Sequence, residues 1–284
     1  MRFAKYHADG NSFLIFWEND SPAQFKLTAE WVRRQCDKRV GIGADGLVWL
    51  RPGTKSDLQW EFFNDDGQKA EFCGNALRCV GQWAFNTSKV ARKFSLDTGF
   101  DLIEIEVENS QTEVKMPLPQ GFVPYLKLSS LPDSILQTFS EMHFVKMGVP
   151  HLLIRVNEKI NLSTRQSRLE WQEKARLFRQ HSYFGAAGTN VSFFVLNSSA
   201  GELFMDTYER GVEDFTLSCG SGLSAMGVIA DLVYKLPSPV LLQTQLAWVS
   251  VRWEKQIGHI MNRYFLKGSA TAVCRGELIE VKKT

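Results

Sequence analysis

The sequence has no excess of charge of either sign and no long apolar run near its start. Its 284 residues include 33 lysines and arginines against 31 aspartates and glutamates, so the formal net charge is only +2. Nothing in this balance indicates a nucleic acid or an anionic membrane as a partner. Residues 1–13, MRFAKYHADGNSF, reach charged residues and Gly-Asn before any useful apolar stretch, which argues against a signal peptide or a spanning helix. We therefore expect a cytoplasmic protein.

Cysteine and histidine are scarce and unsuitably spaced for a metal site. The five histidines, at positions 7, 143, 151, 181 and 259, never come close together, and no CxxC pair occurs. A zinc site or a disulfide framework is therefore not expected, and the thiols should be reduced. Of the five cysteines, Cys36, Cys79 and Cys274 lie in apolar or strand-like stretches without a following glycine. We expect these three in the core.

The chain does contain enough apolar residues, 44% with 12% aromatics, for one large core or two of ordinary size. Short β-type runs alternate with a few helical ones, which predicts a mixed α/β fold. The predicted strands are LIFW, GLVWL, LQWEFF, FVKMG, HLLIRV, NVSFFVL, ELFMDTY and AWVSVRW, and the predicted helices include LTAEWVRRQC and STRQSRLEWQEKARLFRQ. The second half of the chain thus has the same texture as the first.

A hairpin and a linker are predicted near the middle of the chain. LIEIEVENSQTEVKM alternates apolar and polar residues on both sides of a Glu-Asn-Ser-Gln turn, which is typical of a hairpin with one buried face. The next segment, PLPQGFVPY at 117–125, contains three prolines and a glycine that break both periodicities. We interpret it as the linker between a domain that ends at residue 118 and a second domain that begins at residue 119.

Both halves contain Cys-Gly-x-x-Leu at the start of an apolar run that could be a helix. Cys73 begins the first copy and Cys219 the second. They are 146 residues apart (219 minus 73), close to 142, which is half of the 284-residue chain. A repeat at this spacing predicts two similar domains related by a pseudo-twofold axis, with one helix N-terminus from each facing the cleft between them. The two thiols would then face each other.

A helix N-terminus changes the chemistry of a thiol. Its unpaired N–H groups and partial positive charge favour an anion, so the thiol pKa falls from roughly 8.5 to roughly 3.5–7.5 at such sites. The same amides can bind a carboxylate, and Gly74 and Gly220 let a ligand approach the backbone closely. Two opposed thiols above such amides could invert an α-carbon, one removing the proton and the other replacing it on the opposite face.

Seven motifs resemble the diaminopimelate epimerase family of cofactor-independent amino-acid epimerases. They are YHADGNSF (6–13), GIGADGL (41–47), FFNDDGQKAEFCGNALRC (62–79), GVPH (148–151), GTNVSFF (188–194), YERGVEDFTLSCGSG (208–222) and LKGSATAVCRGE (266–277). The resemblance implies two pseudo-symmetric α/β domains, each a curled sheet around a central helix, with the active site between them. It also implies that the last strand, 268–284, joins the first domain, so that the second comprises 119–267.

The resemblance further implies roles for individual residues. Cys73 and Cys219 match the two catalytic thiols. The amides of Gly74, Asn75, Gly220 and Ser221 match those that bind the carboxylate on the reacting carbon. Asn11 and Glu209 match contacts near the reacting or amino groups, and Asn64, Asn190 and Arg210 match residues that hold a far carboxylate, a task that suits the two-pronged guanidinium.

The same resemblance implies the interconversion of LL- and meso-diaminopimelate, for lysine and peptidoglycan precursor synthesis, without pyridoxal phosphate, another cofactor or a metal. The partner would be an amino-acid substrate, with no nucleic acid or membrane, and a homodimer is expected because relatives are often dimeric. Three positions differ from well-known members: Ser12 replaces an aspartate that many have, and Gly46 a glutamine that some have. Val149 replaces an asparagine that many have and that contacts the far end of the substrate. His151 is as well explained as a structural imidazole and stays outside the catalytic set.

Two alternatives remain open from the sequence. The chain could racemise another amino acid, of the proline or histidine type, although Asn64 and Arg210 suit a second carboxylate better than a ring. It could instead be a non-catalytic, redox-responsive protein in which Cys73 and Cys219 form a disulfide. At single positions, Asn64–Gly67 could be only a turn, and Glu209 with Arg210 only a solvated ion pair.

Overall fold

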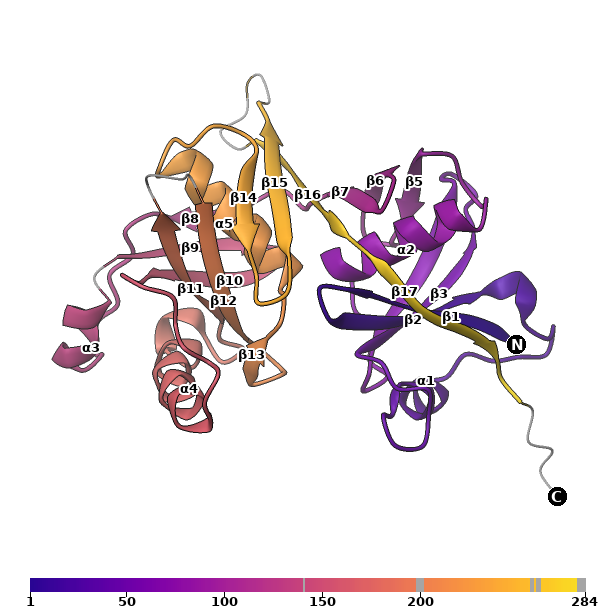
Figure 1. Ribbon diagram of the computed structural model, residues 1–284, viewed down its shortest axis with the longest axis horizontal. Helices are drawn as coiled ribbons and strands as arrows, with labels where there is room; N and C mark the ends of the chain where they lie inside the picture. Colours follow the sequence, from indigo (N-terminus) through magenta and orange to yellow (C-terminus); the bar gives the residue numbers. More distant parts are fainter. Residues whose placement is uncertain (140, 198–201, 256–257, 259–261, 280–284) are drawn as a thin grey trace. The chain divides into compact units, whose positions relative to one another are not determined.

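The computed structural model describes residues 1–139, 141–197, 202–255, 258 and 262–279 (Figure 1). The chain divides into two compact units. Unit 1 comprises residues 1–115 and 267–284, and unit 2 comprises residues 116–266. The chain passes from unit 2 back into unit 1 within strand β16 (Arg263–Ser269), so the final strand β17 (Thr271–Glu277) lies in unit 1.

Unit 1 consists of a mixed sheet and two α-helices. Its strands are β1 (Arg2–Ala8), β2 (Asn11–Trp17), β3 (Gly46–Pro52), β4 (Leu58–Asn64), β5 (Lys93–Asp97), β6 (Leu102–Glu108), β7 (Gln111–Lys115) and β17, and its helices are η1 (Glu18–Asp20), α1 (Ala29–Cys36) and α2 (Gly74–Asn86). The ladder runs β17–β1–β2–β3–β4–β5–β6–β7. The β2–β3 and β4–β5 pairs are parallel, because a crossover containing a helix connects each pair.

Unit 2 has the same plan. Its strands are β8 (Gln120–Val123), β9 (Met142–Met147), β10 (Val149–Arg155), β11 (Asn190–Asn197), β12 (Glu202–Glu209), β13 (Asp214–Thr216), β14 (Val240–Gln243) and β15 (Trp248–Glu254), and its helices are α3 (Asp133–Thr138), α4 (Arg165–Arg179), η2 (Ser182–Phe184) and α5 (Gly220–Leu232). The ladder β8–β9–β10–β11–β12–β14–β15 repeats the order of antiparallel and parallel pairs found from β17 to β6. Thus β2, β3 and β4 correspond to β10, β11 and β12, and α2 corresponds to α5.

Each sheet is covered on both faces. In unit 1 the outer face packs on α1 through residues such as Phe16, Val32 and Trp49, while α2 contacts β1, β2, β6, β7 and β17. In unit 2 a second core between the sheet and α4 includes Phe178 and Phe193, and α5 contacts β9, β10, β14 and β15. A sheet buried on both faces explains why runs such as LIFW and GLVWL are apolar without alternation.

The predicted mixed α/β fold with curled sheets around central helices is confirmed, as are the predicted strands, both predicted helices and the hairpin, which is β6–β7 with a turn at Asn109 and Ser110. The interpretation of 117–125 as a linker throughout is wrong. Residues 120–123 form β8, which pairs with β9. The prolines lie at 117, 119 and 124, outside this short strand, so none interrupts its hydrogen bonds.

Two glycines let the central helices approach their sheets closely. Gly81 lies eight residues after Cys73, and Gly227 lies eight residues after Cys219, so the internal repeat extends to C-G-x-x-L-x-x-x-G. A Cβ atom at Gly81 would lie 2.6 Å from Cγ2 of Thr112, and one at Gly227 would lie 2.3 Å from Cγ1 of Val251. Both distances are below van der Waals contact.

We therefore predict that Gly81→Ala and Gly227→Ala each lower the free energy of unfolding by about 1–3 kcal/mol. In an uncrowded helix interior the same change raises stability by up to about 1 kcal/mol, so the sign is diagnostic. Denaturant unfolding of each variant measures it. Combining Gly81→Ala with Thr112→Ser, which removes the crowding methyl group, should recover part of the loss. An unchanged or higher stability of both single variants would contradict the close approach.

Candidate functional site

The two Cys-Gly motifs each lie at the start of the central helix of their unit, as predicted. Cys73 is the N-cap of α2 and Cys219 the N-cap of α5, both with extended backbone. An α-helix provides no internal acceptor for the N–H groups of its first residues, here Gly74 with Asn75 and Gly220 with Ser221. Each unit therefore places a thiol beside backbone donors and the positive end of a helix dipole, which favour an anion.

The two thiols have different surroundings. Cys73 is half-buried, and its sulfur accepts a hydrogen bond from the backbone N–H of Ala76, at 3.5 Å. Cys219 is only 6% exposed, and its sulfur lies 3.5 Å from the hydroxyl oxygen of Ser221. A Cβ atom at Gly222 would lie 3.3 Å from the hydroxyl oxygen of Thr207, so the start of α5 lies directly against β12.

Four of the remaining predicted residues lie at strand ends, and Arg210 directly follows one of these strands. In unit 1, Asn11 is the first residue of β2 and Asn64 is the last of β4. In unit 2, Asn190 is the first residue of β11 and Glu209 is the last of β12. In unit 1, β2 is parallel to β3 and β3 is antiparallel to β4, so the start of β2 and the end of β4 lie at the same end of the sheet. In unit 2, β11 is antiparallel to β12, so the start of β11 lies beside the end of β12. Each unit therefore gathers these residues at one end of its sheet.

Two other positions that the sequence analysis singled out, Val149 and Gly46, complete this pattern. Val149 is the first residue of β10, where unit 1 has Asn11 as the first residue of β2. Gly46 is the first residue of β3, where unit 2 has Asn190 as the first of β11. A Cβ atom at Gly46 would lie 2.8 Å from the carbonyl oxygen of Phe63, so unit 1 has no room for a side chain there.

Asn190 and Arg210 are linked in unit 2. The side-chain oxygen of Asn190 accepts a hydrogen bond from the backbone N–H of Arg210, at 2.7 Å. Both Glu209 and Arg210 are half-buried, so they are not a freely solvated pair. Among the described residues, no acceptor pairs with the guanidinium of Arg210, which leaves this cation available to an acidic ligand.

Asn64 is exposed at the end of β4, and the carbonyl of the same residue accepts a hydrogen bond from the N–H of Gly67, at 3.0 Å. The turn expected at 64–67 therefore exists. Because the turn uses only the backbone of Asn64, its side-chain amide is left outside the turn's hydrogen bonding. A structural and a binding role are compatible at this residue.

His151 is fully buried in β10, beside Asn190 in the parallel ladder. Neither ring nitrogen has a hydrogen-bond partner among the described residues. Burial, with a smaller contribution from the charge of Arg210, lowers its pKa to about 3, so the imidazole is neutral at neutral pH. The equivalent position in unit 1, third in β2, is the core residue Phe13, which favours a packing role for His151.

Two supporting residues of unit 1, Asp45 and Arg78, had no role in the sequence-based prediction, although both lie within the quoted motifs. Asp45, from GIGADGL, accepts hydrogen bonds at Oδ2 from the backbone N–H of Ser12 (2.8 Å), the Ser12 hydroxyl (3.0 Å) and the Asn11 amide (3.4 Å). Burial raises the pKa of Asp45, but the bonds from Ser12 and Lys38 outweigh it and the net shift is downward. The serine at position 12 is thus bound to an ionised Asp45. Arg78, from CGNALRC, is the second such residue.

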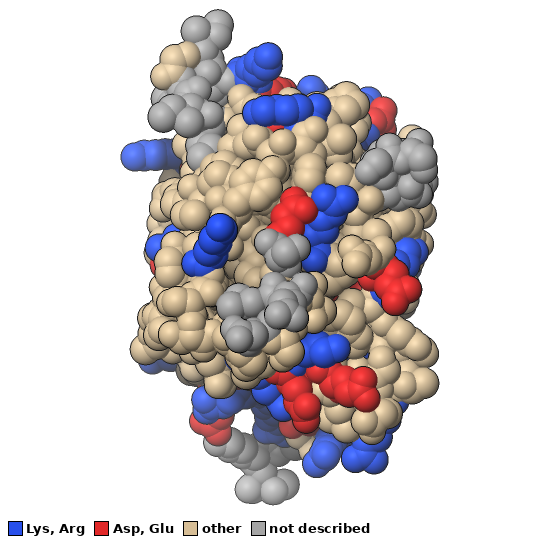
Figure 2. Space-filling model, turned by 90° about the vertical axis from the view of Figure 1, so that its left-hand side faces the viewer, with Lys and Arg blue, Asp and Glu red and all other residues tan. Residues whose placement is uncertain are grey.

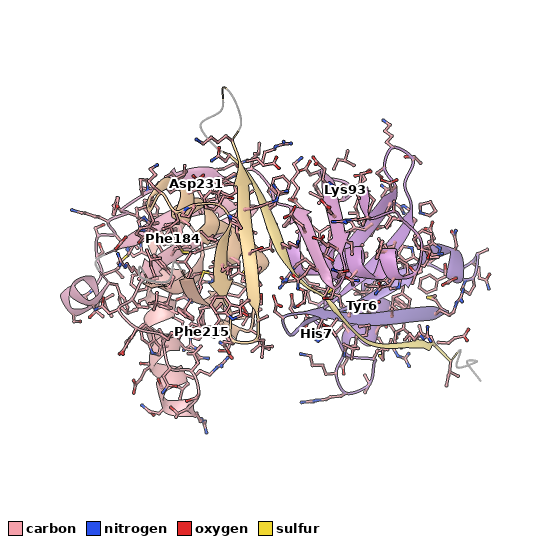
Figure 3. All side chains as sticks on the ribbon, turned by 45° about the horizontal axis from the view of Figure 1, so that its top comes forward. Tyr6, His7, Lys93, Phe184, Phe215 and Asp231 are labelled. Atoms are coloured by element: carbon pink, nitrogen blue, oxygen red, sulfur yellow. The ribbon has the colours of Figure 1, made fainter. Side chains whose placement is uncertain are left out.

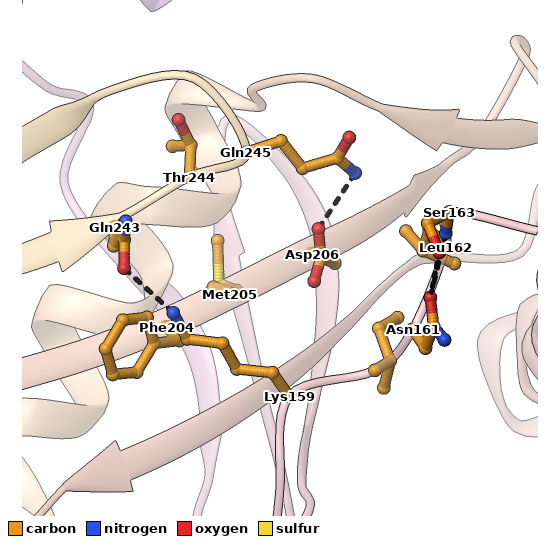
Figure 4. A pocket seen from close by; sticks show the side chains of 11 residues that line it. Lys159, Asn161, Leu162, Ser163, Phe204, Met205, Asp206, Gln243, Thr244 and Gln245 are labelled. Atoms are coloured by element: carbon orange, nitrogen blue, oxygen red, sulfur yellow. Dashed lines mark hydrogen bonds between the residues drawn. The ribbon is translucent and has the colours of Figure 1, made fainter.

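No predicted site residue lines the two hollows described here. One, of about 410 Å³ in unit 2, lies beside β12, where Gln245 donates to Asp206 and Lys159 donates to Gln243, both at 2.9 Å (Figure 4).

On the face drawn in Figure 2, basic side chains are interspersed with acidic ones. Among the described residues, which exclude His259, no three His, Cys, Asp or Glu residues form a metal-binding group. No helix within the described ranges is long and apolar enough to cross a membrane.

Solved structures share this fold. A hydroxyproline epimerase from Agrobacterium vitis, with bound trans-4-hydroxy-L-proline, aligns with a TM-score of 0.71 at 14% identity, covering 98% of this chain and 90% of that one. A Bacillus anthracis phenazine biosynthesis protein of the PhzF family aligns with a TM-score of 0.74 at 12% identity, covering 99% of both chains. The protein therefore shares its fold with these two proteins, and each of its units has a thiol at the start of its central helix.

Sequence comparison then identifies the family. The sequence model for diaminopimelate epimerase matches residues 3–120. Diaminopimelate epimerase of Aquifex aeolicus (strain VF5) is 31% identical over 294 aligned residues, covering 99% of this chain and 98% of that protein, and that of Helicobacter pylori (strain Shi470) is 32% identical over 85% of each. The chain belongs to the diaminopimelate epimerase family. It is an isomerase, of the class of amino-acid epimerases.

One expectation about the cysteines is wrong. Cys36 and Cys79 are buried as expected, but Cys274 is exposed. Residues 271–275 of β17 are exposed on both faces of the strand, so its strand-like sequence did not imply burial. Cys274 lines a hollow of about 840 Å³ in unit 1 together with Trp17 and Trp83.

We predict that, of these three cysteines, Cys274 is alkylated first in the native protein. Burial, with smaller contributions from Asp65 and Asp45, raises the pKa of Cys36 to about 12, and burial also raises the pKa of Cys79. Both should react at least about tenfold more slowly than Cys274, because the thiolate is the nucleophile. Peptide mass spectrometry after timed iodoacetamide treatment measures the three rates, with unfolded protein as the control. Equal rates in the native state would contradict the assigned burial.

Proposed function

We propose that the protein interconverts LL- and meso-diaminopimelate with Cys73 and Cys219 as the two acid–base groups. The observation that carries the proposal is the repeated placement of a cysteine at the N-terminus of a buried helix, once in each unit. Family membership supports the substrate. In this proposal the domains are residues 1–118 with 268–284, and residues 119–267, and the substrate binds between them.

The reaction in this proposal is a proton removal followed by a proton addition. One cysteine, as thiolate, takes the proton from the α-carbon, and the electron pair of the broken C–H bond is delocalised into the adjacent carboxylate. The amides of Gly74, Asn75, Gly220 and Ser221 donate hydrogen bonds to that carboxylate, where charge develops. The other cysteine, as thiol, adds its proton to the opposite face. The two thiols exchange roles in the reverse direction.

The other residues select the substrate. Asn11 and Glu209 bind near the reacting carbon, where a carboxylate suits the α-ammonium group. Asn64, Asn190 and Arg210 bind the far carboxylate. The hydrogen bond that joins Asn190 to the backbone of Arg210 supports this role, as does the lack of an acceptor for the Arg210 guanidinium within the described part of the chain. The half-buried Val149 offers the substrate an apolar contact in place of an amide. The proposal needs no cofactor or metal and places a homodimeric enzyme in the cytoplasm, in lysine and peptidoglycan precursor synthesis.

We predict that Cys73→Ala and Cys219→Ala each abolish the conversion of LL- to meso-diaminopimelate by the reduced protein. Loss of either group removes one of the two proton transfers, and such groups typically contribute about 10²–10⁴-fold or more. Proton NMR of the substrate with time measures the conversion. The matched control is Cys274→Ala, which removes an exposed thiol outside the proposed site and should retain wild-type activity.

Three outcomes of this experiment would contradict the proposal. Full activity of either single variant would remove that thiol from the mechanism. An inactive reduced wild type would reject the substrate, and a panel with L-proline and L-histidine would then test the alternative racemases. Mass analysis without reductant, before and after dithiothreitol, tests the redox alternative, which expects a reversible Cys73–Cys219 disulfide and no turnover in either state.

We further predict that the far carboxylate is required. Arg210→Met should lower kcat/KM for LL-diaminopimelate by about 10- to 100-fold, because a hydrogen bond to a charged group contributes about 1.5–3 kcal/mol. L-lysine, which lacks the second carboxylate, should be a poor substrate for the wild type and should be little affected by the variant. Steady-state kinetics measure both, with the exposed Arg165→Met as the control. Equal loss on both substrates would reject the assigned contact.

A further inference from the structure

A fully buried ion pair involves α2, the helix that begins at the Cys-Gly motif of unit 1. Arg78, on α2, is 0% exposed, and its Nη2 lies 2.8 Å from Oδ2 of Asp9. Asp9 lies in the turn between β1 and β2 with a φ of +51°, followed by Gly10 at +89°. The Gly10 N–H donates to Nδ1 of His7, labelled in Figure 3, at 3.2 Å. Arg78 thus connects the first turns of α2 to the turn that precedes Asn11.

The same guanidinium fixes the orientation of Asn75. Nη2 of Arg78 donates to the side-chain oxygen of Asn75 at 2.7 Å. Arginine has only donors, so the oxygen of Asn75 must face it and the NH₂ group must point away. That NH₂ group donates to the side-chain oxygen of Asn11 at 3.2 Å. Asn11 is fixed in turn, because its own NH₂ group donates to the carboxylate of Asp45 at 3.4 Å.

The corresponding position of unit 2 shows that the fold does not require this arginine. Ser224 lies five residues after Cys219, as Arg78 lies five residues after Cys73. The hydroxyl of Ser224 donates to the carbonyl of Gly220 within α5, at 2.9 Å. The same architecture therefore forms with a small residue, whose hydroxyl bonds within the described part of unit 2 to the backbone of its own helix.

The arrangement is also poorly explained by stability alone. Burying an arginine removes its hydration, and breaking even with an apolar side chain requires good partners for all donors. Nε of Arg78 has no hydrogen-bond partner among the described residues, and the bond from Nη1 to the carbonyl of Ser269 is long, at 3.4 Å. The short hydrogen bonds of the Arg78 guanidinium are those to Asn75 and Asp9.

We propose that Arg78 is a positioning residue that sets the side-chain orientation of Asn75, and through it of Asn11, so that both present fixed N–H donors and acceptors to the substrate. This inference rests on the proposed function for the identity of the substrate. Arg78 itself does not contact the reacting atoms. Its effect should pass through Asn75, which a double-mutant cycle can detect.

The test compares Arg78→Met, Asn75→Ala and the double variant by steady-state kinetics. Arg78→Met should lower kcat/KM by about tenfold or more, mainly through KM, and should cause less than about a twofold further loss in the Asn75→Ala background. The matched control is Gln82→Met, one turn further along α2. Gln82 is also buried and donates to Asn86 and Asn109, so its loss should lower stability without changing kcat/KM by more than about twofold.

The outcomes separate positioning from a structural role. If the two losses multiply fully in the double variant, or if folded Arg78→Met retains wild-type kinetics, the proposal is overturned. If Arg78→Met does not fold, the same cycle is run with Arg78→Lys. The single ammonium of lysine cannot reproduce all the contacts of Arg78 with Asp9, Asn75 and Ser269, so activity should fall partly in the wild-type background and not in Asn75→Ala.

A substrate-free measurement distinguishes this inference from the proposed function. The side-chain amide signal of Asn75, assigned by its loss in Asn75→Ala, should shift and exchange faster with water in Arg78→Met, or in Arg78→Lys if only that variant folds. It should be unchanged in Gln82→Met. This result with a wild type inactive on LL-diaminopimelate would reject the substrate and retain the positioning role. An unchanged Asn75 signal overturns the positioning role, whatever the activity.

Discussion

Enclosure of one helix by strands is the constraint on which both units depend. All residues of α2 from Gly74 to Ala84 are buried, and in α5 only Ser221, Asp231 and Leu232 are partly exposed. A helix enclosed in this way has no free side, so its backbone can meet a ligand only at its ends. The N-terminal end is the one that favours anions. The glycines at 81 and 227 permit the enclosure, and the cysteines at 73 and 219 place a titratable group at that end.

The two half-sites share a plan but differ in how they are supported. In unit 1 the residue after Cys73-Gly74 is Asn75, held by Arg78 and bonded to Asn11. In unit 2 the corresponding residue is Ser221, close to its own cysteine, and the polar side chains come from β11 and β12. The repeated fold therefore provides two helix N-termini, one in each unit. Because different residues surround each of them, the two half-sites can bind different parts of a substrate. The proposed reaction needs this, because the four substituents of the reacting α-carbon differ from one another.

Much of this could be predicted from the sequence, because local patterns carry it. Cys-Gly before an apolar run predicted both helix starts, and alternation predicted the β6–β7 hairpin. The repeat also predicted two similar domains, but the strand order within each ladder could not be predicted, because parallel pairing depends on contacts far apart in the chain. Strand β8 was not predicted, because the segment around it is rich in proline. A four-residue strand can nevertheless lie between prolines without including one. Strand-like sequence placed Cys274 in the core, although burial depends on what covers the strand.

The contact by which Arg78 holds Asn75 could not be predicted from the sequence either. In sequence it is one basic residue in an apolar helix, and such residues are rarely buried unless paired. Its partner Asp9 is 69 residues away, so only the fold brings the two together. The motifs quoted from the sequence contained Asp9, Asp45 and Arg78, but the sequence offers no physical signal that distinguishes a residue that holds a binding residue from the binding residue itself.

Hydrogen exchange during the first turnovers tests the two-thiol account most directly. LL-diaminopimelate is mixed with reduced protein in deuterated water, and the reaction is stopped early for isotope analysis of both stereoisomers. Two separate thiols predict that the meso product carries one solvent deuterium at the inverted α-carbon, while the remaining LL-substrate carries none. Each base meets only one face, so the proton removed is not the one returned. Substantial substrate hydrogen in the early product would indicate a single base acting on both faces and would contradict the account.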